Sequence, residues 1–182
     1  MLIYRAENID NVLTPEECNS IVEQADINGW EAGKIWTTDG PLNSRVDKRY
    51  INADRSRVEF DWLTARLDSV FQEANDRIWN FELGGPVTTR VARYQPGGFF
   101  KQHIDLGGEL GFNRKLTMTI QLSPFDDYDG GYLSLVNVSH TPAMQQGDAT
   151  MYPTFIPHGV TEVQRGTRYS LIAWVEGSRP FR

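Results

Sequence analysis

This chain of 182 residues has little of several residue types, and each shortage excludes a class of protein. Its single cysteine, Cys18, excludes an internal disulfide and a zinc site built on cysteines. No apolar run approaches the roughly 20 residues that a membrane-spanning helix needs. Residues 1–5 lack a basic segment leading into an apolar one, so we expect no secretory signal and a cytoplasmic protein.

Positive charge is also scarce. The chain carries 18 Lys and Arg against 24 Asp and Glu, a net charge of −6. Binding to a phosphate backbone depends on clustered Lys and Arg, so this balance argues against nucleic acid as the main partner. The length and ordinary apolar content predict one domain over residues 1–182, large enough to bury a sizeable core.

The N-terminal half predicts two helices. Thr14 is a typical N-cap and Pro15 a typical first helical residue, and Asn28-Gly29 is expected to end this helix. A second helix is predicted over about residues 58–79, with an apolar stripe made of Phe60, Leu63, Leu67, Val70, Phe71, Ala74 and Ile78. This stripe is interpreted as core.

Between the two helices, residues 30–53 break into short extended pieces, separated by Gly33, Gly40 and Pro41. Residues 45–51 are the strand most favoured in this segment, and residues 2–9 also predict a short strand. The first 85 residues are therefore expected to form helical support and substrate-side segments.

After residue 85 the pattern changes to short β-rich runs punctuated by Gly, Pro, Asp and Asn. The predicted strands cover residues 87–94, 115–122, 132–136, 149–152, 159–163 and 167–175. Such a series favours an antiparallel sandwich or jelly roll. The fold class is thus mainly β (α+β), with residues 86–178 as the β core and the N-terminal helices supporting one face.

Three residues have the chemistry and order of a metal site. His103 and Asp105 are two positions apart, and side chains two apart on a strand point to the same face. His158 follows 55 positions later, on a late strand. Two histidines and one carboxylate with open positions are typical of non-haem Fe(II) oxygenases. The remaining histidine, His140, lies in a turn-like segment and is interpreted as a solvated loop residue.

Ten positions beyond His158, Arg168 precedes the apolar stretch 171–175, which indicates a buried strand. A buried arginine needs an anionic partner, and none is evident nearby in the sequence. Ser170 faces the same way as Arg168 on such a strand. A guanidinium beside a hydroxyl suits a ligand carboxylate.

These features belong to a longer set of motifs over residues 94–174. The set comprises Tyr94 and Gly97 before His103-Ile104-Asp105, then Arg114-Lys115-Leu116-Thr117, Tyr128-Asp129-Gly130-Gly131, Gln146-Gly147-Asp148-Ala149, Pro157-His158-Gly159-Val160 and Arg165-Gly166-Thr167-Arg168. It resembles the Fe(II)/2-oxoglutarate-dependent dioxygenases, in particular the prolyl 4-hydroxylase-like and PKHD-type hydroxylases. The resemblance implies a double-stranded β-helix, a jelly-roll variant related to cupins.

The resemblance also implies residue roles. The iron ligands would be His103, Asp105 and His158, and Arg168 would hold the distal carboxylate of 2-oxoglutarate. Tyr94 would reach the same co-substrate, and the further positions implied are Ser170, Thr117 and Gln121. The implied cofactors are Fe(II), 2-oxoglutarate and O2, with ascorbate as reductant. No separate acid or base is expected, because the metal supplies the chemistry.

The implied reaction hydroxylates a C–H bond of a peptide or free amino acid and releases succinate and CO2, with proline as the first expectation. Two alternatives stay open: a jelly-roll binding module without turnover, and a cupin-type metalloenzyme that does not use 2-oxoglutarate. Substrate choice is expected to lie in residues 30–53 and 106–113. Trp36, Arg45 and Tyr50 would there form a lid over a peptide or small-molecule substrate, or else a solvated strand face.

Overall fold

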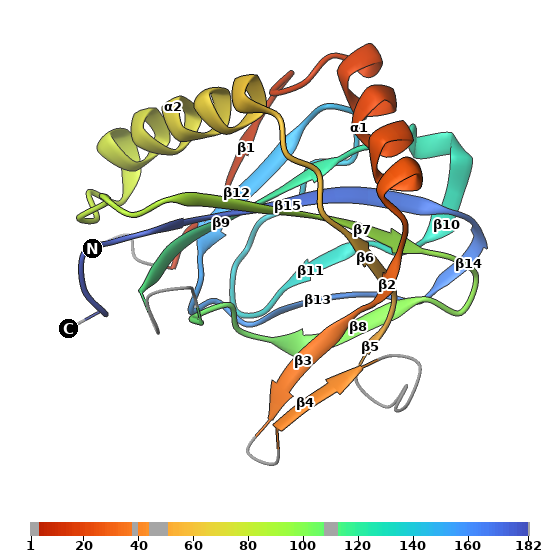
Figure 1. Cartoon of the computed structure of the whole chain (residues 1–182). Helices are drawn as coiled ribbons and strands as arrows, with labels where there is room; N and C mark the ends of the chain where they lie inside the picture. Colours follow the sequence, from red (N-terminus) through yellow and green to blue (C-terminus); the bar gives the residue numbers. More distant parts are fainter. Residues whose placement is uncertain (1–3, 38–39, 44–50, 108–112, 182) are drawn as a thin grey trace.

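The computed structural model describes residues 4–37, 40–43, 51–107 and 113–181. Within them, two antiparallel sheets face each other and two helices cover the outer face of the larger sheet (Figure 1). The larger sheet has the strand order β1 (Glu7–Ile9), β12 (Ala149–Pro153), β9 (Arg114–Gln121), β15 (Arg168–Glu176), β7 (Val87–Tyr94), β6 (Asp54–Ser56) and β2 (Glu31–Ala32).

The smaller sheet has the order β11 (Leu133–Leu135), β13 (His158–Val160), β8 (Phe99–His103) and β5 (Ile51–Asn52). Two further antiparallel pairs join β10 (Tyr128–Gly130) to β14 (Val163–Gly166), and β3 (Lys34–Thr37) to β4 (Gly40–Asn43). A short 3-10 turn, η1 (Phe125–Asp127), precedes β10. The layered arrangement is the predicted jelly-roll type, and Figure 1 shows the β3–β4 hairpin extending away from the body of the molecule.

The predicted start of the first helix, α1 (Pro15–Asn28), is confirmed. The Thr14 side chain accepts a hydrogen bond from the Glu17 backbone N–H at 3.2 Å, and the Glu17 carboxylate accepts one from the Thr14 N–H at 2.9 Å. This reciprocal capping satisfies two donors that the helix itself leaves without partners. Glu17 also pairs with Arg66 of the second helix, α2 (Asp61–Ile78), at 2.6 Å.

The main core lies between the helices and the larger sheet. The predicted stripe of α2 supplies its fully buried residues Leu63, Leu67, Phe71 and Ala74, while Phe60, Val70 and Ile78 pack against it partly buried. Alternate residues of the central strands point to the same core: Leu116, Met118 and Ile120 from β9, and Leu171, Ala173 and Val175 from β15. The other residues of these strands face the smaller sheet, and that side forms the site.

The first half of the chain contributes more β structure than predicted. Strands β1, β2 and β6 extend the larger sheet and β5 extends the smaller one, so both sheets contain residues from before position 85. Gly40 and Pro41, predicted to interrupt strands, lie inside β4, where Pro41 pairs with Trp36 across the hairpin. The strand predicted over residues 45–51 falls mostly outside the described residues, and β5 begins at its last position.

Candidate metal and co-substrate site

Three side chains meet between the two sheets. His103 ends β8 and His158 begins β13, and these two residues are opposite each other in the antiparallel register. His103 Nε2 lies 3.4 Å from Asp105 Oδ1, and His158 Nε2 lies 3.3 Å from Asp105 Oδ2. The ligand atoms of all three residues lie within 4.8 Å of one another. Across the described ranges, no other group of three or more His, Cys, Asp or Glu is close enough to hold a metal ion.

Asp105 does not lie on the strand that carries His103, contrary to prediction. Strand β8 ends at His103, and Asp105 follows in a loop whose backbone N–H donates to the Thr154 carbonyl at 2.9 Å. This hydrogen bond ties the loop to the residue that follows β12, and the carboxylate there reaches the two imidazoles. The predicted proximity therefore holds, although alternation along a strand is not its cause.

The main chain sets the orientation of both imidazoles. His103 Nδ1 lies 2.8 Å from the Lys101 carbonyl oxygen, and His158 Nδ1 lies 3.0 Å from that of Ile156. A carbonyl oxygen can only accept, so each Nδ1 carries a hydrogen. Each Nε2 then faces Asp105. Metal-ligating histidines usually have this arrangement, in which the other ring nitrogen donates to a carbonyl or carboxylate.

This geometry fits a cation. When both histidines are neutral, two Nε2 lone pairs face carboxylate oxygens at 3.3–3.4 Å, which is repulsive unless a proton or a metal ion lies between them. Donor atoms at adjacent octahedral corners, with bonds of about 2.1 Å, are separated by about 3 Å. Two imidazoles and one carboxylate are also the donor set expected for Fe(II).

Charge on Asp105 is strongly stabilised. Burial alone would raise the pKa of this carboxyl, but when the imidazoles are protonated, attraction to His158 and hydrogen bonds from both histidines hold its pKa well below its ordinary value. Two other donors also reach Asp105 Oδ2: the Trp174 indole N–H at 2.9 Å and the Thr117 hydroxyl at 3.2 Å. Asp105 is thus held as an oriented carboxylate.

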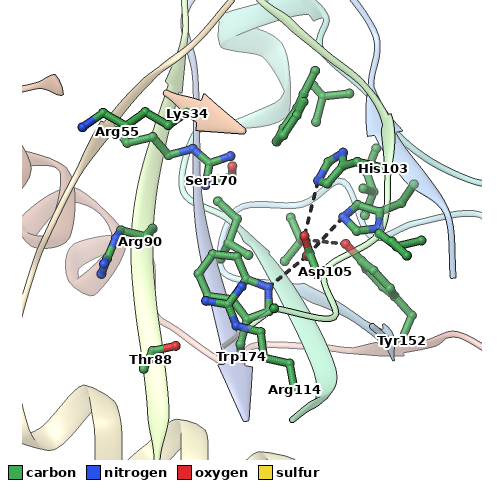
Figure 2. A pocket seen from close by; sticks show the side chains of 18 of the residues that line it. Lys34, Arg55, Thr88, Arg90, His103, Asp105, Arg114, Tyr152, Ser170 and Trp174 are labelled. Carbon is green, nitrogen blue, oxygen red and sulfur yellow. Dashed lines mark hydrogen bonds and ion pairs between the residues drawn. The ribbon is translucent and has the colours of Figure 1, made fainter. Parts of the chain in front are cut away.

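Aromatic rings enclose the two histidines. Phe100 stacks on His103 with centroids 3.7 Å apart and planes 17° apart, and the Tyr152 ring lies edge-on to His158 at 4.8 Å. The Tyr152 hydroxyl lies 3.3 Å from the Thr119 hydroxyl. Figure 2 shows Tyr152 and His103 on one side of the cavity, with Asp105 between them and Trp174. The sequence analysis did not single out Phe100, Tyr152 or Trp174, because in a strand they resemble ordinary core residues.

Arg168 lies at the start of β15, a central strand, and is only 1% exposed. Its Nε and Nη2 donate to Gln121 Oε1 at 3.1 and 2.9 Å. Its Nη1 is buried and has no hydrogen-bond partner among the described residues. Gln121 is neutral, so the guanidinium charge lacks a carboxylate partner within the described part of the chain. An unpaired buried charge is costly, which favours an anionic ligand beside Nη1.

Gly131 gives Arg168 its space. Its φ is +63°, a conformation that residues with a Cβ rarely adopt. A Cβ at this position would come within 3.1 Å of Arg168 Cδ and 2.7 Å of Val163 Cγ2. Gly131, the second glycine of the motif that the sequence analysis noted, therefore packs against the Arg168 side chain.

The other residues predicted to contact the co-substrate divide into two groups. Tyr94 and Ser170 line the same cavity as Arg168, and Tyr94 is directly opposite Arg168 in the β15–β7 register. Thr117 contacts Asp105, and Gln121 is engaged by Arg168 and by the Ala143 carbonyl, which its amide N–H₂ meets at 3.0 Å. Thr117 thus orients the Asp105 carboxylate, and Gln121 orients the Arg168 guanidinium.

One cavity of about 970 Å³ is lined by the three candidate metal ligands and by Arg168. Its floor is the inner face of the larger sheet, where Arg168, Ser170, Ile172 and Trp174 alternate along β15. The histidines and Asp105 lie at its other wall. A volume of this size is at the upper end of that of small-molecule sites.

Of the predicted substrate residues, Arg45 and Tyr50 lie outside the described residues, as do residues 108–112 of the second predicted segment. Trp36 lies in β3, opposite Pro41. His140, predicted to be a solvated loop residue, is not part of the metal cluster, and its Nε2 lies 2.9 Å from the Asn8 side-chain oxygen. None of the helices in the described residues is long and apolar enough to cross a membrane.

Comparisons with known proteins identify the fold and the family. The family model of the 2OG-Fe(II) oxygenase superfamily matches residues 89–176. Among solved structures, a Pseudomonas putida prolyl-4-hydroxylase superposes with a TM-score of 0.73 at 16% identity, covering 96% of this chain and 93% of that one. A prolyl hydroxylase from Trichoplax adhaerens, solved with a hypoxia inducible factor peptide fragment, gives 0.72 at 19% identity, covering 94% and 83%. The fold is therefore the double-stranded β-helix of the 2OG oxygenases, as the resemblance implied.

The sequence relatives narrow this class. A PKHD-type hydroxylase of Cupriavidus pinatubonensis is 30% identical over 92% of this chain and 77% of its own length. The chain belongs to the PKHD-type hydroxylases of the 2OG-Fe(II) oxygenase superfamily. It is accordingly an enzyme, and the family implies Fe(II), 2-oxoglutarate and O2.

Proposed function

We propose that this protein hydroxylates a C–H bond of a peptidyl or free amino-acid substrate, with proline as the first residue to test. In this proposal His103, Asp105 and His158 hold Fe(II), and Arg168 holds the distal carboxylate of 2-oxoglutarate. Bound together, Fe(II), 2-oxoglutarate and O2 supply an oxidation that converts the co-substrate to succinate and CO2 and inserts oxygen into the substrate. Ascorbate would keep the iron reduced.

One observation carries the proposal: two unsatisfied charge requirements lie in a single cavity. At one wall, Nε2 atoms face carboxylate oxygens and require a cation. On the floor, the buried Arg168 Nη1 requires an anion. A metal-chelating dicarboxylate that bridges the two positions answers both requirements, and 2-oxoglutarate has that chemistry.

The protein's own residues have positioning roles. Trp174 and Thr117 hold Asp105 in its charged form, and the Lys101 and Ile156 carbonyls orient the imidazoles. Gln121 fixes two of the guanidinium N–H groups, which leaves Nη1 directed to a ligand. The aromatic rings of Phe100 and Tyr152 pack against the imidazoles of His103 and His158.

Structural similarity to a prolyl hydroxylase solved with a peptide supports a peptide or amino-acid substrate. The Trichoplax adhaerens prolyl hydroxylase was solved with a peptide fragment, and its fold matches this chain over 94% of its length. A cavity of about 970 Å³ would hold the co-substrate together with a further side chain. The remaining alternative is a metalloenzyme of the same shape that does not use 2-oxoglutarate.

Two measurements test the proposal. Anaerobic addition of Fe(II) and 2-oxoglutarate should produce a weak visible charge-transfer band, which a site without 2-oxoglutarate would not give. With O2, succinate should then form slowly in an iron-dependent reaction. Mass spectrometry of proline-containing peptides, free amino acids and short oligonucleotides should find a gain of one oxygen in the first two classes. Absence of the band and of 2-oxoglutarate binding would overturn the proposal.

A further inference from the structure

The cavity has a charge composition that the iron and co-substrate do not explain. Six of its lining residues are basic and one, Asp105, is acidic: the basic ones are Lys34, Arg55, Arg57, Arg90, Arg114 and Arg168. The whole chain has the opposite balance, with 18 basic and 24 acidic residues. Apart from Arg168 and Asp105, which are assigned to co-substrate and metal, the described lining has five basic residues and no acidic one. Two of the five, Arg90 and Arg114, have partners within the protein.

Arg55 is the most informative of these cations. It is half-buried in β6 and lies directly opposite Ala92 of β7. Ala92 in turn lies opposite Ser170 of β15, so Arg55 and Ser170 are in one row across the sheet. Its guanidinium lies over the Phe100 ring, 5.5 Å from the centroid, and the same ring stacks on His103. In Figure 2, Lys34, Arg55 and Arg90 lie across the cavity from His103 and Asp105. A substrate oxidised at the metal would therefore lie between them.

Strand alternation explains why Arg55 has no carboxylate. On β6, the preceding residue Asp54 is opposite Arg93 of β7, and the two form an ion pair at 2.8 Å on the other face of the sheet. The acidic residue of this strand is thereby used away from the cavity. Among the described residues no carboxylate forms an ion pair with Arg55, and its buried Nε has no hydrogen-bond partner.

A guanidinium that is half-buried, lies over an aromatic ring and has no anionic partner is well placed to bind an anion. Its planar fork matches a carboxylate, with which it can form two parallel charge-assisted hydrogen bonds. Most of the uncharged lining is aliphatic or aromatic, including Ile104, Leu133, Val160 and Ile172, and Thr88, Thr119 and Ser170 add hydroxyl groups. This combination suits a short apolar body that ends in an acid group. A nucleic-acid strand would instead require a groove that tracks its backbone.

We propose that the substrate carries a carboxylate and that Arg55 binds it, holding the reactive carbon toward the metal. The proposal rests on the proposed function and specifies the substrate class: an amino acid with a free α-carboxylate, or a peptide with an acidic side chain beside the oxidised residue. These two sources share one chemistry, and matched compounds separate them.

The test is equilibrium binding to the full-length protein loaded with Fe(II) and 2-oxoglutarate under anaerobic conditions, read by calorimetry and by the change in the visible band. The first pair of probes is N-acetyl-proline and its carboxamide. The second pair is N-acetyl-Pro-Glu-amide and N-acetyl-Pro-Gln-amide. A short oligothymidylate is the fifth probe.

In at least one pair the acid should bind about tenfold or more tightly than the amide, which corresponds to about 1.4 kcal/mol. Arg55→Gln should remove this preference, and Arg55→Lys should retain part of it. Arg165→Gln is the matched control, because Arg165 is exposed and pairs with Asp129 away from the cavity. Circular dichroism of each variant shows that it is folded.

Equal binding of acid and amide in both pairs, a preference that survives in Arg55→Gln, binding of the oligothymidylate alone, or a panel in which no probe binds would each overturn the proposal. If the protein binds no 2-oxoglutarate at all, the proposed function itself is wrong. If the band forms normally and only the acid preference is absent, the proposed function stands and the role of Arg55 does not.

Discussion

The two faces of the larger sheet are built from the same strands but have opposite chemistry. On β15, Leu171, Ala173 and Val175 face the helices, while Ser170 and Trp174 face the cavity. Strand β9 behaves in the same way, with apolar residues toward the helices and Thr117, Thr119 and Gln121 on the other side. Both faces are buried, so burial alone does not distinguish a core from a site. The cavity face differs because its polar groups are arranged to bind a charged ligand.

The helix face should then determine stability and the cavity face should determine binding. Substitutions on one strand, at neighbouring positions, can separate these two properties. The following experiments begin with the largest expected effect.

Replacement of either histidine ligand should abolish metal binding. In His158→Ala and His103→Ala, Asp105 loses one of the two imidazoles that face it, and a site with two protein ligands binds iron poorly. The measurement is anaerobic Fe(II) titration by calorimetry, with circular dichroism to show that the fold persists. His140→Ala is the control and should bind iron like the unmodified protein. Equal loss in His140→Ala would show that the ligands are wrongly assigned.

Leu171→Ala should destabilise the fold by about 2–5 kcal/mol, because it leaves a cavity between β15 and the helices. Ser170→Ala, one position earlier on the opposite face, should change the free energy of unfolding by about 1 kcal/mol or less. Urea unfolding measures both. If Ser170→Ala destabilised the protein as much as Leu171→Ala, the two faces would not differ in the way proposed.

Arg168→Gln should weaken 2-oxoglutarate binding by about 10- to 100-fold, since charge-assisted hydrogen bonds contribute about 1.5–3 kcal/mol. Stability should change little or improve, because the variant removes a buried charge that has only a neutral partner. Calorimetric titration of the metal-loaded protein measures the affinity, with Arg165→Gln as control. Unchanged affinity would exclude Arg168 as the carboxylate-binding residue.

Trp174→Phe keeps an aromatic ring on the cavity floor but removes the N–H that donates to Asp105 Oδ2. Loss of such a contact to a ligand typically lowers metal affinity by about tenfold or more. The expected result is weaker Fe(II) binding with nearly normal stability. A large loss of stability with normal Fe(II) affinity would assign Trp174 to the core instead.

Cys18 should show no reaction at all. It lies on the helix face, fully buried, and burial raises the pKa of its thiol to about 12, so it stays protonated at neutral and mildly alkaline pH. A thiol reagent such as Ellman's should modify the denatured protein and leave the native protein unmodified. Rapid reaction of the native protein would show that the helices open easily.

The sequence predicted the long, regular parts of the fold well. The strand predicted over residues 87–94 is β7 with the same bounds, and α1 begins and ends where its capping residues indicated. Strands β6, β10 and β14 were not predicted, because each has only three or four residues and depends on partners far along the chain.

The sequence predicted the residues of the site by their type and order. It did not predict the hydrogen bonds between them, because these depend on tertiary contacts. The order of His103, Asp105, His158 and Arg168 identified the cluster and the cavity. That Gln121 would accept from Arg168 depends on the β15–β9 register. That Trp174 would donate to Asp105 depends on where the loop after β8 lies against the larger sheet. No local pattern encodes either of these. The position of Asp105 beyond its strand likewise follows from a hydrogen bond to Thr154, remote in sequence.

The hydrogen bonds that orient the two imidazoles have a consequence for how such a site can change. Each Nδ1 binds the carbonyl of the residue two positions earlier, Lys101 in one case and Ile156 in the other. Every amino acid provides that carbonyl, so neither position restricts its side chain for the sake of the metal. One of these residues is basic and the other aliphatic, yet their carbonyls orient the imidazoles in the same way. Substitutions at these two positions can therefore reshape the surroundings of the site while the histidines stay aimed.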